Sequence, residues 1–362
     1  MTVTGRLVRT LALAQAGQVI LPDDLLTVII NVLEAIADPS ISERQRIGLA
    51  DRLFETLNVE FIPPNPSLGA AYWSAMMRHV WHWEDSNRLV HKGSAYYFLG
   101  TNFLRLGDIP SAYISLFSAL EEDKRSYPSL GADYRNSPVY KTTSLIDDSG
   151  NVLFPSVVVP LRNDLQGYLV SYLALGGSSI SMNTIDSKFL QESRLEDVKR
   201  FFVATLHEIH HLAPINSTRM MLNDYSKTKV IDTLFNLGLV INQTLEQAYL
   251  ASMSRLDMAN AVHQLWLARR WTTERNVGTF IHGFSPDPNS GTPDQILRPY
   301  LDGTALFNGS RMDAKMLAIP IAYILRNYGG HHLEVSNILV NRYPDVLRNM
   351  MHAFLLAIDS LP

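Results

Sequence analysis

Most of the chain places its apolar residues at helical spacing, in segments that proline and glycine separate. This spacing indicates amphipathic helices that bury one face, and it does not suit strands, whose side chains alternate between two faces. Residues 126–160 differ, because Pro128, Gly131, Pro138 and a β-branched run at 157–159 favour loop with a short hairpin. The sequence therefore predicts an all-α fold with one irregular region.

That irregular region divides the chain into three parts. We expect an N-terminal helical domain at residues 1–125, a linker with a possible short hairpin at 126–185, and a C-terminal helical domain at 186–362. A chain of 362 residues with 46% hydrophobic residues can bury a core in each domain. In the C-terminal domain, Pro214 is expected to end one helix, and residues 272–298 are expected to form a long irregular loop.

Composition excludes several classes of site. The chain has no cysteine, so disulfides and Cys-ligated metal centres are excluded, and any metal would be held by His, Asp and Glu. Its net charge of −4 gives no chain-wide basic field, so a nucleic acid would be met only at a local site. No apolar run approaches the roughly 20 residues of a membrane span. We expect a cytoplasmic protein without a membrane partner.

Residues 94–123 carry the clearest local pattern, a pair of helices separated near Gly107. The positions that define it are Tyr96, Leu99, Gly100, Phe103, Gly107, Ala112, Leu116 and Ala119. This spacing resembles a single tetratricopeptide-type repeat, and small residues at Gly100 and Ala112 would allow close helix packing. About three repeats are needed for a stable array, so a local helical hairpin remains the alternative. A protein partner for this half also remains open.

Two motifs carry candidate chemistry, and the first is His207-Glu-Ile-His-His211. On a helix, His207 and His211 lie one turn apart and can share a zinc ion, with Glu208 as the general base. The segment resembles the gluzincin metallopeptidases, in which a downstream glutamate, here Glu246, would be the third ligand. His210 occupies a position that is ordinarily apolar in that family. A polar helix stripe remains the structural alternative.

The second motif is Arg326-Asn-Tyr-Gly-Gly-His-His332, which lies before the last expected helix. Arg326 and His331 match the pattern R-x4-6-H, and the glycine pair at 329–330 suggests a close backbone approach. Arginine binds phosphate through a permanent, bidentate charge, and histidine titrates where acid-base catalysis needs it. A helix C-cap by Gly329 and the histidines is the alternative.

Two further pairs satisfy the same short pattern, namely Arg200 with His207 and Arg275 with His282. Position distinguishes Arg326 and His331, because they stand late in the chain, at an apolar helix followed by one closing helix. This arrangement over residues 190–362 resembles the HEPN family of all-α ribonucleases. The resemblance predicts a HEPN-like helical bundle at 186–362.

The resemblance implies a metal-independent endoribonuclease, with RNA as its substrate and no cofactor. Arg326 would hold the scissile phosphate and His331 would be the acid or base, with Asn327 orienting the phosphate and His332 assisting. A homodimer would complete the site, and the family suggests a toxin or antiviral-defence effector, with a protein partner or antitoxin possible. Two alternatives remain: a zinc-dependent metallopeptidase, and a non-catalytic helical scaffold for dimerisation or RNA binding.

Overall fold

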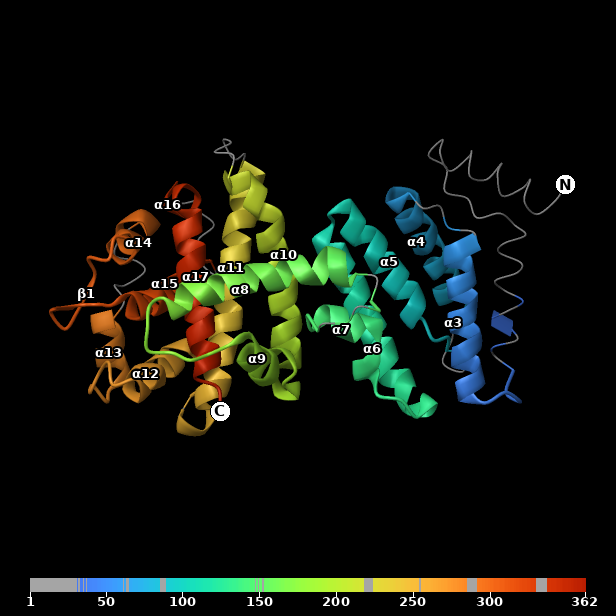
Figure 1. Cartoon of the computed structure of the whole chain (residues 1–362), viewed down its shortest axis with the longest axis horizontal. Coiled ribbons are helices and arrows are strands. Elements are labelled where there is room, and N and C mark those ends of the chain that lie inside the picture. The colour runs from blue at the N-terminus through green and yellow to red at the C-terminus, as the bar shows by residue number, and fades with distance from the viewer. Residues whose placement is uncertain are drawn as a thin grey trace. The chain divides into compact units, whose positions relative to one another are not determined.

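The structure, a computed structural model, describes residues 31, 33, 34, 36, 38–60, 62, 65–84, 89–146, 148, 150, 151, 153–217, 224–253, 255–284, 292–329 and 337–362. These residues are helical almost throughout (Figure 1). The one sheet among them is an antiparallel pair of strands, β1 (Leu306–Phe307) with β2 (Ser310–Arg311). The all-α prediction is confirmed.

The chain separates into two compact units, Met1–Phe154 and Pro155–Pro362. The helices of the first unit are α3 (Glu43–Glu60), α4 (Pro66–Trp83), α5 (Gly93–Leu106), α6 (Ile109–Leu130), the 3₁₀ turn η1 (Tyr134–Asn136) and α7 (Pro138–Thr143). Its core centres on the buried Trp73, whose ring stacks on Phe98 at 5.4 Å and meets the edge of Phe54 at 6.1 Å. These aromatic contacts join α3, α4 and α5.

Helices α5 and α6 form the hairpin predicted for residues 94–123. Gly107 ends α5 in the left-handed conformation, with φ of 75°, and the Asp108 side chain accepts a hydrogen bond from the Ser111 amide at the start of α6. At Gly100 an added Cβ would lie 2.9 Å from Leu116 Cγ and 3.2 Å from the Ala112 carbonyl oxygen. Glycine is therefore what allows these two helices to approach, as the sequence suggested.

The second unit is a bundle built around α11. The π-helical turn η2 (Phe154–Val158) comes directly before the first helix of this bundle. Its elements are α8 (Val159–Leu173), α9 (Met182–Ile185), η3 (Asp186–Leu190), η4 (Ser193–Leu195), α10 (Glu196–Ser217), α11 (Asp224–Tyr249), η5 (Leu250–Ser252), α12 (Met258–Ala268), α13 (Val277–Phe284), α14 (Pro293–Leu301), α15 (Ala314–Gly329), α16 (Asn337–Asn341) and α17 (Tyr343–Asp359).

Helix α11 packs against α10, α12, α15 and α17, and α8 runs across α10 and α17 (Figure 1). The middle of α17 is almost completely buried. There Phe354 stacks on Phe202 with ring centroids 4.2 Å apart, and the edge of Phe189 meets Phe354 at 5.1 Å. This apolar centre joins η3, α10 and α17. No helix in the described residues is both long and apolar enough to cross a membrane.

Helix replaces part of the irregular structure expected for 126–160, whereas the described residues between 144 and 153 stay outside helices. Helix α6 continues to Leu130, because Pro128 stands in its last turn and Gly131 supplies the left-handed C-cap. The β-branched residues at 157–159 are helical, since burial of Val157 and Val158 overrides their preference for strands. The predicted short hairpin is thus wrong. The boundary between the two units falls between residues 154 and 155, inside the segment expected as linker.

Two further expectations in the second unit differ from the structure. Helix α10 continues past Pro214 to Ser217. The long loop expected at 272–298 contains α13 and the start of α14. Side-chain caps explain these short helices, because Asn276 Oδ1 accepts from the Thr279 amide at 3.0 Å and Thr292 forms a capping box with Gln295.

Candidate functional site

Arg326 lies in the last turns of α15, on the side that packs against α11. Gly238 of α11 makes this approach possible, because an added Cβ there would lie 3.0 Å from Arg326 Cβ and 3.3 Å from its Cα. The sequence predicted a close backbone approach near this arginine, and assigned it to the glycines at 329–330. Within the described residues, the glycine that permits it belongs to the neighbouring helix.

The Arg326 guanidinium is half-buried, and its charge is only partly matched by its surroundings. Its Nη1 donates to Asn327 Oδ1 at 3.0 Å, so the two predicted site residues contact each other. Its Nε has no hydrogen-bond partner among the described residues, and Arg326 makes no ion pair with any of them. A buried N–H without a partner is costly. The Nε edge of the guanidinium is therefore buried and unpartnered among the described residues.

Two polar residues of α11 face the same region. Burial raises the pKa of Glu246, while a hydrogen bond from Asn242 and the positive charge of Arg326 act in the opposite direction. Asn242 is 5% exposed, and its Oδ1 has no hydrogen-bond partner in the part of the chain that the structure describes. Arg326, Asn327, Asn242 and Glu246 thus form a polar group between α11 and α15, which we call the Arg326 site.

The predicted histidines of this site, His331 and His332, lie outside the described residues. They follow α15, which ends at Gly329, in the chain. The predicted contact between Arg326 and His331 therefore stays a prediction.

The other two R-x4-6-H pairs have different surroundings. Arg200 is 8% exposed and its Nη2 lies 2.6 Å from Glu196 Oε1, so its charge is taken up by an ion pair within α10. Arg275 and His282 are both exposed. Of the three arginines, Arg326 is the one that is half-buried without an ion pair to a described residue.

The H-E-x-x-H segment lies on α10, as predicted. Burial, followed by the nearby charges of His210 and His211, lowers the pKa of His207 to about 4, whereas His211 is exposed. Glu208 accepts a long hydrogen bond of 3.5 Å from Thr233 of α11. Glu246, the predicted third ligand, is next to Arg326 and Asn242. Over the described residues, no three His, Asp or Glu side chains form a group that could hold a metal. Zinc stays a prediction that this geometry does not favour.

The histidine between the predicted ligands has a partner that the sequence did not indicate. His210 Nδ1 lies 2.7 Å from Asp164 Oδ2 of α8, across 46 positions of sequence. Only the unusual polarity of His210 within the motif signalled a role, and nothing in the sequence pointed to Asp164. The pair stands at the edge of a cleft between α8, α10 and α17.

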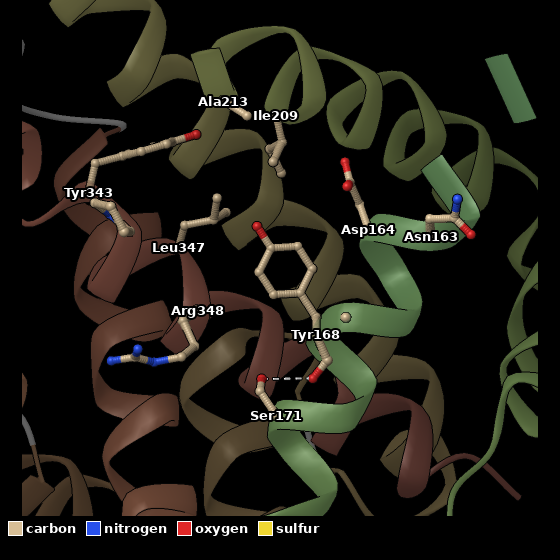
Figure 2. Close-up of a pocket in the computed structure, with 11 residues that line it drawn as sticks. Asn163, Asp164, Tyr168, Ser171, Ile209, Ala213, Tyr343, Leu347 and Arg348 are labelled. Atoms are coloured by element: carbon tan, nitrogen blue, oxygen red, sulfur yellow. Dashed lines mark hydrogen bonds between the residues drawn. The ribbon is translucent and has the colours of Figure 1, made fainter. Parts of the chain in front are cut away.

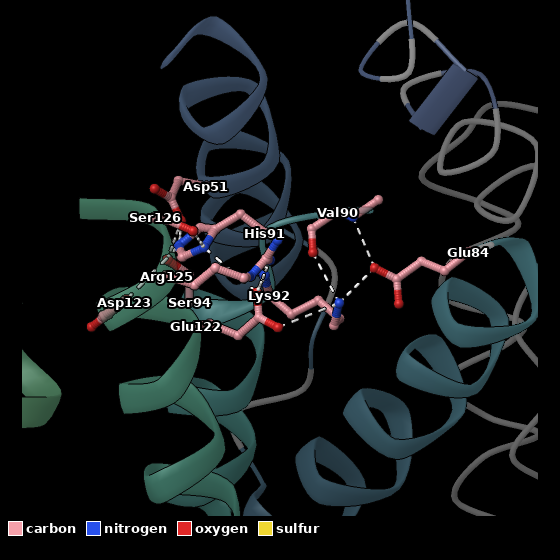
Figure 3. A network of polar contacts seen from close by, with 10 residues as sticks. All are labelled: Asp51, Glu84, Val90, His91, Lys92, Ser94, Glu122, Asp123, Arg125 and Ser126. Carbon is pink, nitrogen blue, oxygen red and sulfur yellow. Dashed lines mark hydrogen bonds and ion pairs between the residues drawn. The ribbon is translucent and has the colours of Figure 1, made fainter. Parts of the chain in front are cut away.

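The first unit holds a polar network around His91 and Lys92 (Figure 3). His91 Nδ1 lies 2.9 Å from Ser126 Oγ. Lys92 Nζ donates to Glu84 Oε1 at 2.5 Å and to the Val90 carbonyl at 2.9 Å. Both side chains are more than nine-tenths buried, and each is surrounded by partners from its own unit. The network therefore links the segments around α4, α5 and α6. Its polar groups form hydrogen bonds and ion pairs with one another.

Comparison with known proteins adds no relative. No family model matches the chain, and searches of curated proteins and of solved structures found no match. A function for this chain therefore has to be argued from its own residues.

Proposed function

We propose that this chain is a metal-independent endoribonuclease in which Arg326 and His331 act on the scissile phosphate of RNA. The observation that carries the proposal is the state of Arg326, a half-buried guanidinium that makes no ion pair with a described residue. A phosphate would supply the negative charge that Arg326 lacks among the described residues. Asn327 supports this role, because its Oδ1 holds one nitrogen of the guanidinium and limits its rotation.

The proposed reaction is a transfer within the RNA backbone. His331 takes the proton of the ribose 2′-hydroxyl, and the 2′-oxygen attacks the phosphorus. Arg326 stabilises the charge that develops on the phosphate oxygens. The bond to the 5′-oxygen breaks, and a second histidine, His332 or His331 of a second copy, protonates that oxygen. The products are a 2′,3′-cyclic phosphate and a 5′-hydroxyl. A homodimer that joins two Arg326 sites, and a role as a toxin or defence effector with a protein partner, belong to the same proposal.

The test is RNA cleavage by the full chain in excess EDTA. We expect Arg326→Ala and His331→Ala each to reduce the rate at least about a hundredfold, the range for loss of a charge stabiliser or a general acid-base group. Arg275→Ala and His282→Ala are the matched controls, because this exposed pair also matches the pattern R-x4-6-H and its loss should leave the rate unchanged.

Four results would count against the proposal. The first is an absence of cleavage of single-stranded and structured RNA by the wild-type chain. The second is cleavage that EDTA abolishes. The third is a chain purified with zinc that His207→Ala removes, which would favour the metallopeptidase alternative. Equal loss of activity in the Arg275 and Arg326 variants would also remove the argument from Arg326.

A further inference from the structure

A cleft of about 550 Å³ opens between α8, α10 and α17, separate from the Arg326 site in its lining residues. Its volume lies in the range of small-molecule sites. Apolar walls come from Ile209 and Ala213 of α10 and from Leu347 of α17, while Asp164 and Tyr168 of α8 provide polar groups. An apolar cleft with a few convergent polar groups is typical of a site for an organic ligand.

The hydroxyl of Tyr168 points into this cleft, between Ile209 and Leu347 (Figure 2). Among the described residues it has no hydrogen-bond partner. The Tyr343 hydroxyl, on a side chain that is 2% exposed, also lacks a partner within this part of the chain. The Tyr343 hydroxyl is therefore left without the hydrogen bond that a buried hydroxyl normally makes, while Tyr168 is only partly buried. A ligand in the cleft could supply the missing hydrogen bonds.

The cleft lining carries one carboxylate, that of Asp164, and one guanidinium, that of Arg348. Asp164 uses Oδ2 for His210, and its Oδ1 has no partner among the residues described. Arg348 is the cation in the lining, but it is directed away from Tyr168 (Figure 2) and its Nη2 lies 2.7 Å from Asp345 Oδ1. The Asp164 carboxylate also raises the pKa of Tyr168, after burial, to about 12, so the phenol remains protonated at neutral pH. The charge that acts on Tyr168 is thus the Asp164 carboxylate, so this end of the cleft favours a neutral or cationic occupant.

Gly167 supplies an independent observation. It lies in the interior of α8 and lines the cleft, and an added Cβ would meet no atom of the described chain within 4 Å. Glycine in a helix interior costs about 0.5–1 kcal/mol relative to alanine. Gly167 is itself exposed, so a larger side chain at this position would extend into the cleft that it lines.

We propose that this cleft binds a small aromatic amine. The ring packs between Ile209, Leu347 and Tyr168, and the ammonium group lies at Asp164 Oδ1, where it forms a charge-assisted hydrogen bond. The face of Tyr168 adds a cation–π contact. The proposal stands on the cleft alone and does not depend on ribonuclease activity.

A charge-matched series of indoles tests it. Calorimetric titration of the full chain with tryptamine, indole and indole-3-acetate compares a cation, a neutral molecule and an anion on one ring system. We expect tryptamine to bind most tightly and indole-3-acetate most weakly, with about a tenfold difference between the amine and the neutral ring, as one charge-assisted hydrogen bond provides.

Two variants locate the binding. Asp164→Asn should remove the preference for the amine and leave the binding of indole unchanged. Gly167→Leu should abolish the binding of all three, because the new side chain fills the cleft while suiting a helix. Gly48→Leu is the matched control, since Gly48 also stands inside a helix with no atom within 4 Å of an added Cβ, and it lies in the first unit. It should bind as the wild type does.

Circular dichroism would confirm that the Gly167→Leu chain is folded. The proposal is overturned if tryptamine does not bind at millimolar concentration, if indole-3-acetate binds as tightly as tryptamine, or if the folded Gly167→Leu chain binds tryptamine like the wild type.

Discussion

Two polar regions of this protein differ in how completely their groups are partnered. Around His91 and Lys92, in the first unit, each buried charge contacts groups of the opposite charge or hydrogen-bond acceptors on α4, α5 or α6 (Figure 3). At the cleft of the second unit, the buried Tyr343 hydroxyl lacks a partner among the described residues, and the Tyr168 hydroxyl points into the cleft (Figure 2). The first region has the character of a structural network and the second that of a binding site.

The glycines of the two regions show the same difference. An added Cβ at Gly93 would lie 2.6 Å from Asp123 Oδ1 and 2.8 Å from His91 Nε2, so the network itself requires glycine there. At Gly167 an added Cβ meets nothing. A buried polar group or a glycine that its own chain explains needs no ligand.

The largest expected effect is that of Lys92→Met. It leaves the Glu84 and Glu122 carboxylates, 2.5 and 3.5 Å from Nζ, without their buried partner, which should destabilise the first unit by about 3–5 kcal/mol. Arg348→Met at the cleft removes a half-exposed ion pair and should cost under about 1 kcal/mol. Hydrogen exchange of the amides of α5 and of α17 measures the loss of stability in the first and the second unit, respectively. Similar losses of protection would mean that the network is not structural.

The next effect depends on pH. Burial, with the nearby Asp51 and Glu122 carboxylates, raises the pKa of Asp123 from 3.8 to about 7, against a hydrogen bond from Ser137. Because the folded pKa is the higher one, the protonated carboxyl stabilises the fold below about pH 4, and this contribution is lost as pH rises through 7.

The variant that isolates this contribution is Asp123→Asn. It should gain on the order of 2 kcal/mol relative to wild type between about pH 5 and pH 8, measured by urea denaturation. The neighbouring His91, whose pKa burial lowers, has the opposite dependence on pH but is present in both proteins. If the difference in unfolding free energy between Asp123→Asn and wild type is the same at pH 5 and pH 8, the pKa of Asp123 is not raised.

The smallest effect compares the two glycines directly. Gly93→Ala should destabilise the first unit by about 1–2 kcal/mol, since the new methyl group displaces Asp123 and His91. Gly167→Ala should stabilise α8 by about 0.5–1 kcal/mol, because it adds helix propensity without a contact. Thermal unfolding of both variants shows whether each substitution raises or lowers the stability. If Gly167→Ala destabilises the protein, other residues of the chain must fill the space beside Gly167.

Much of the fold was predictable because its signals are local. The α5–α6 hairpin followed from apolar spacing over 94–123 and from a glycine at the turn, and the structure confirms it. The hairpin expected near 157–159 was wrong, because β-branched residues prefer strands only until burial in a helical unit outweighs that preference. The loop expected at 272–298 hid two short helices whose caps, Asn276 and Thr292, are ordinary loop residues as well.

By itself, the sequence determined an all-α chain without disulfides, and it placed Arg326 and Asn327 next to each other at a helix end. Tertiary structure decided their surroundings, through Gly238 and Glu246 of another helix. It also decided the pair of Asp164 with His210, which 46 positions separate. Helical periodicity and capping act over a few residues, so a sequence shows them. Which helix faces meet depends on how the whole apolar core packs, and no local pattern encodes that.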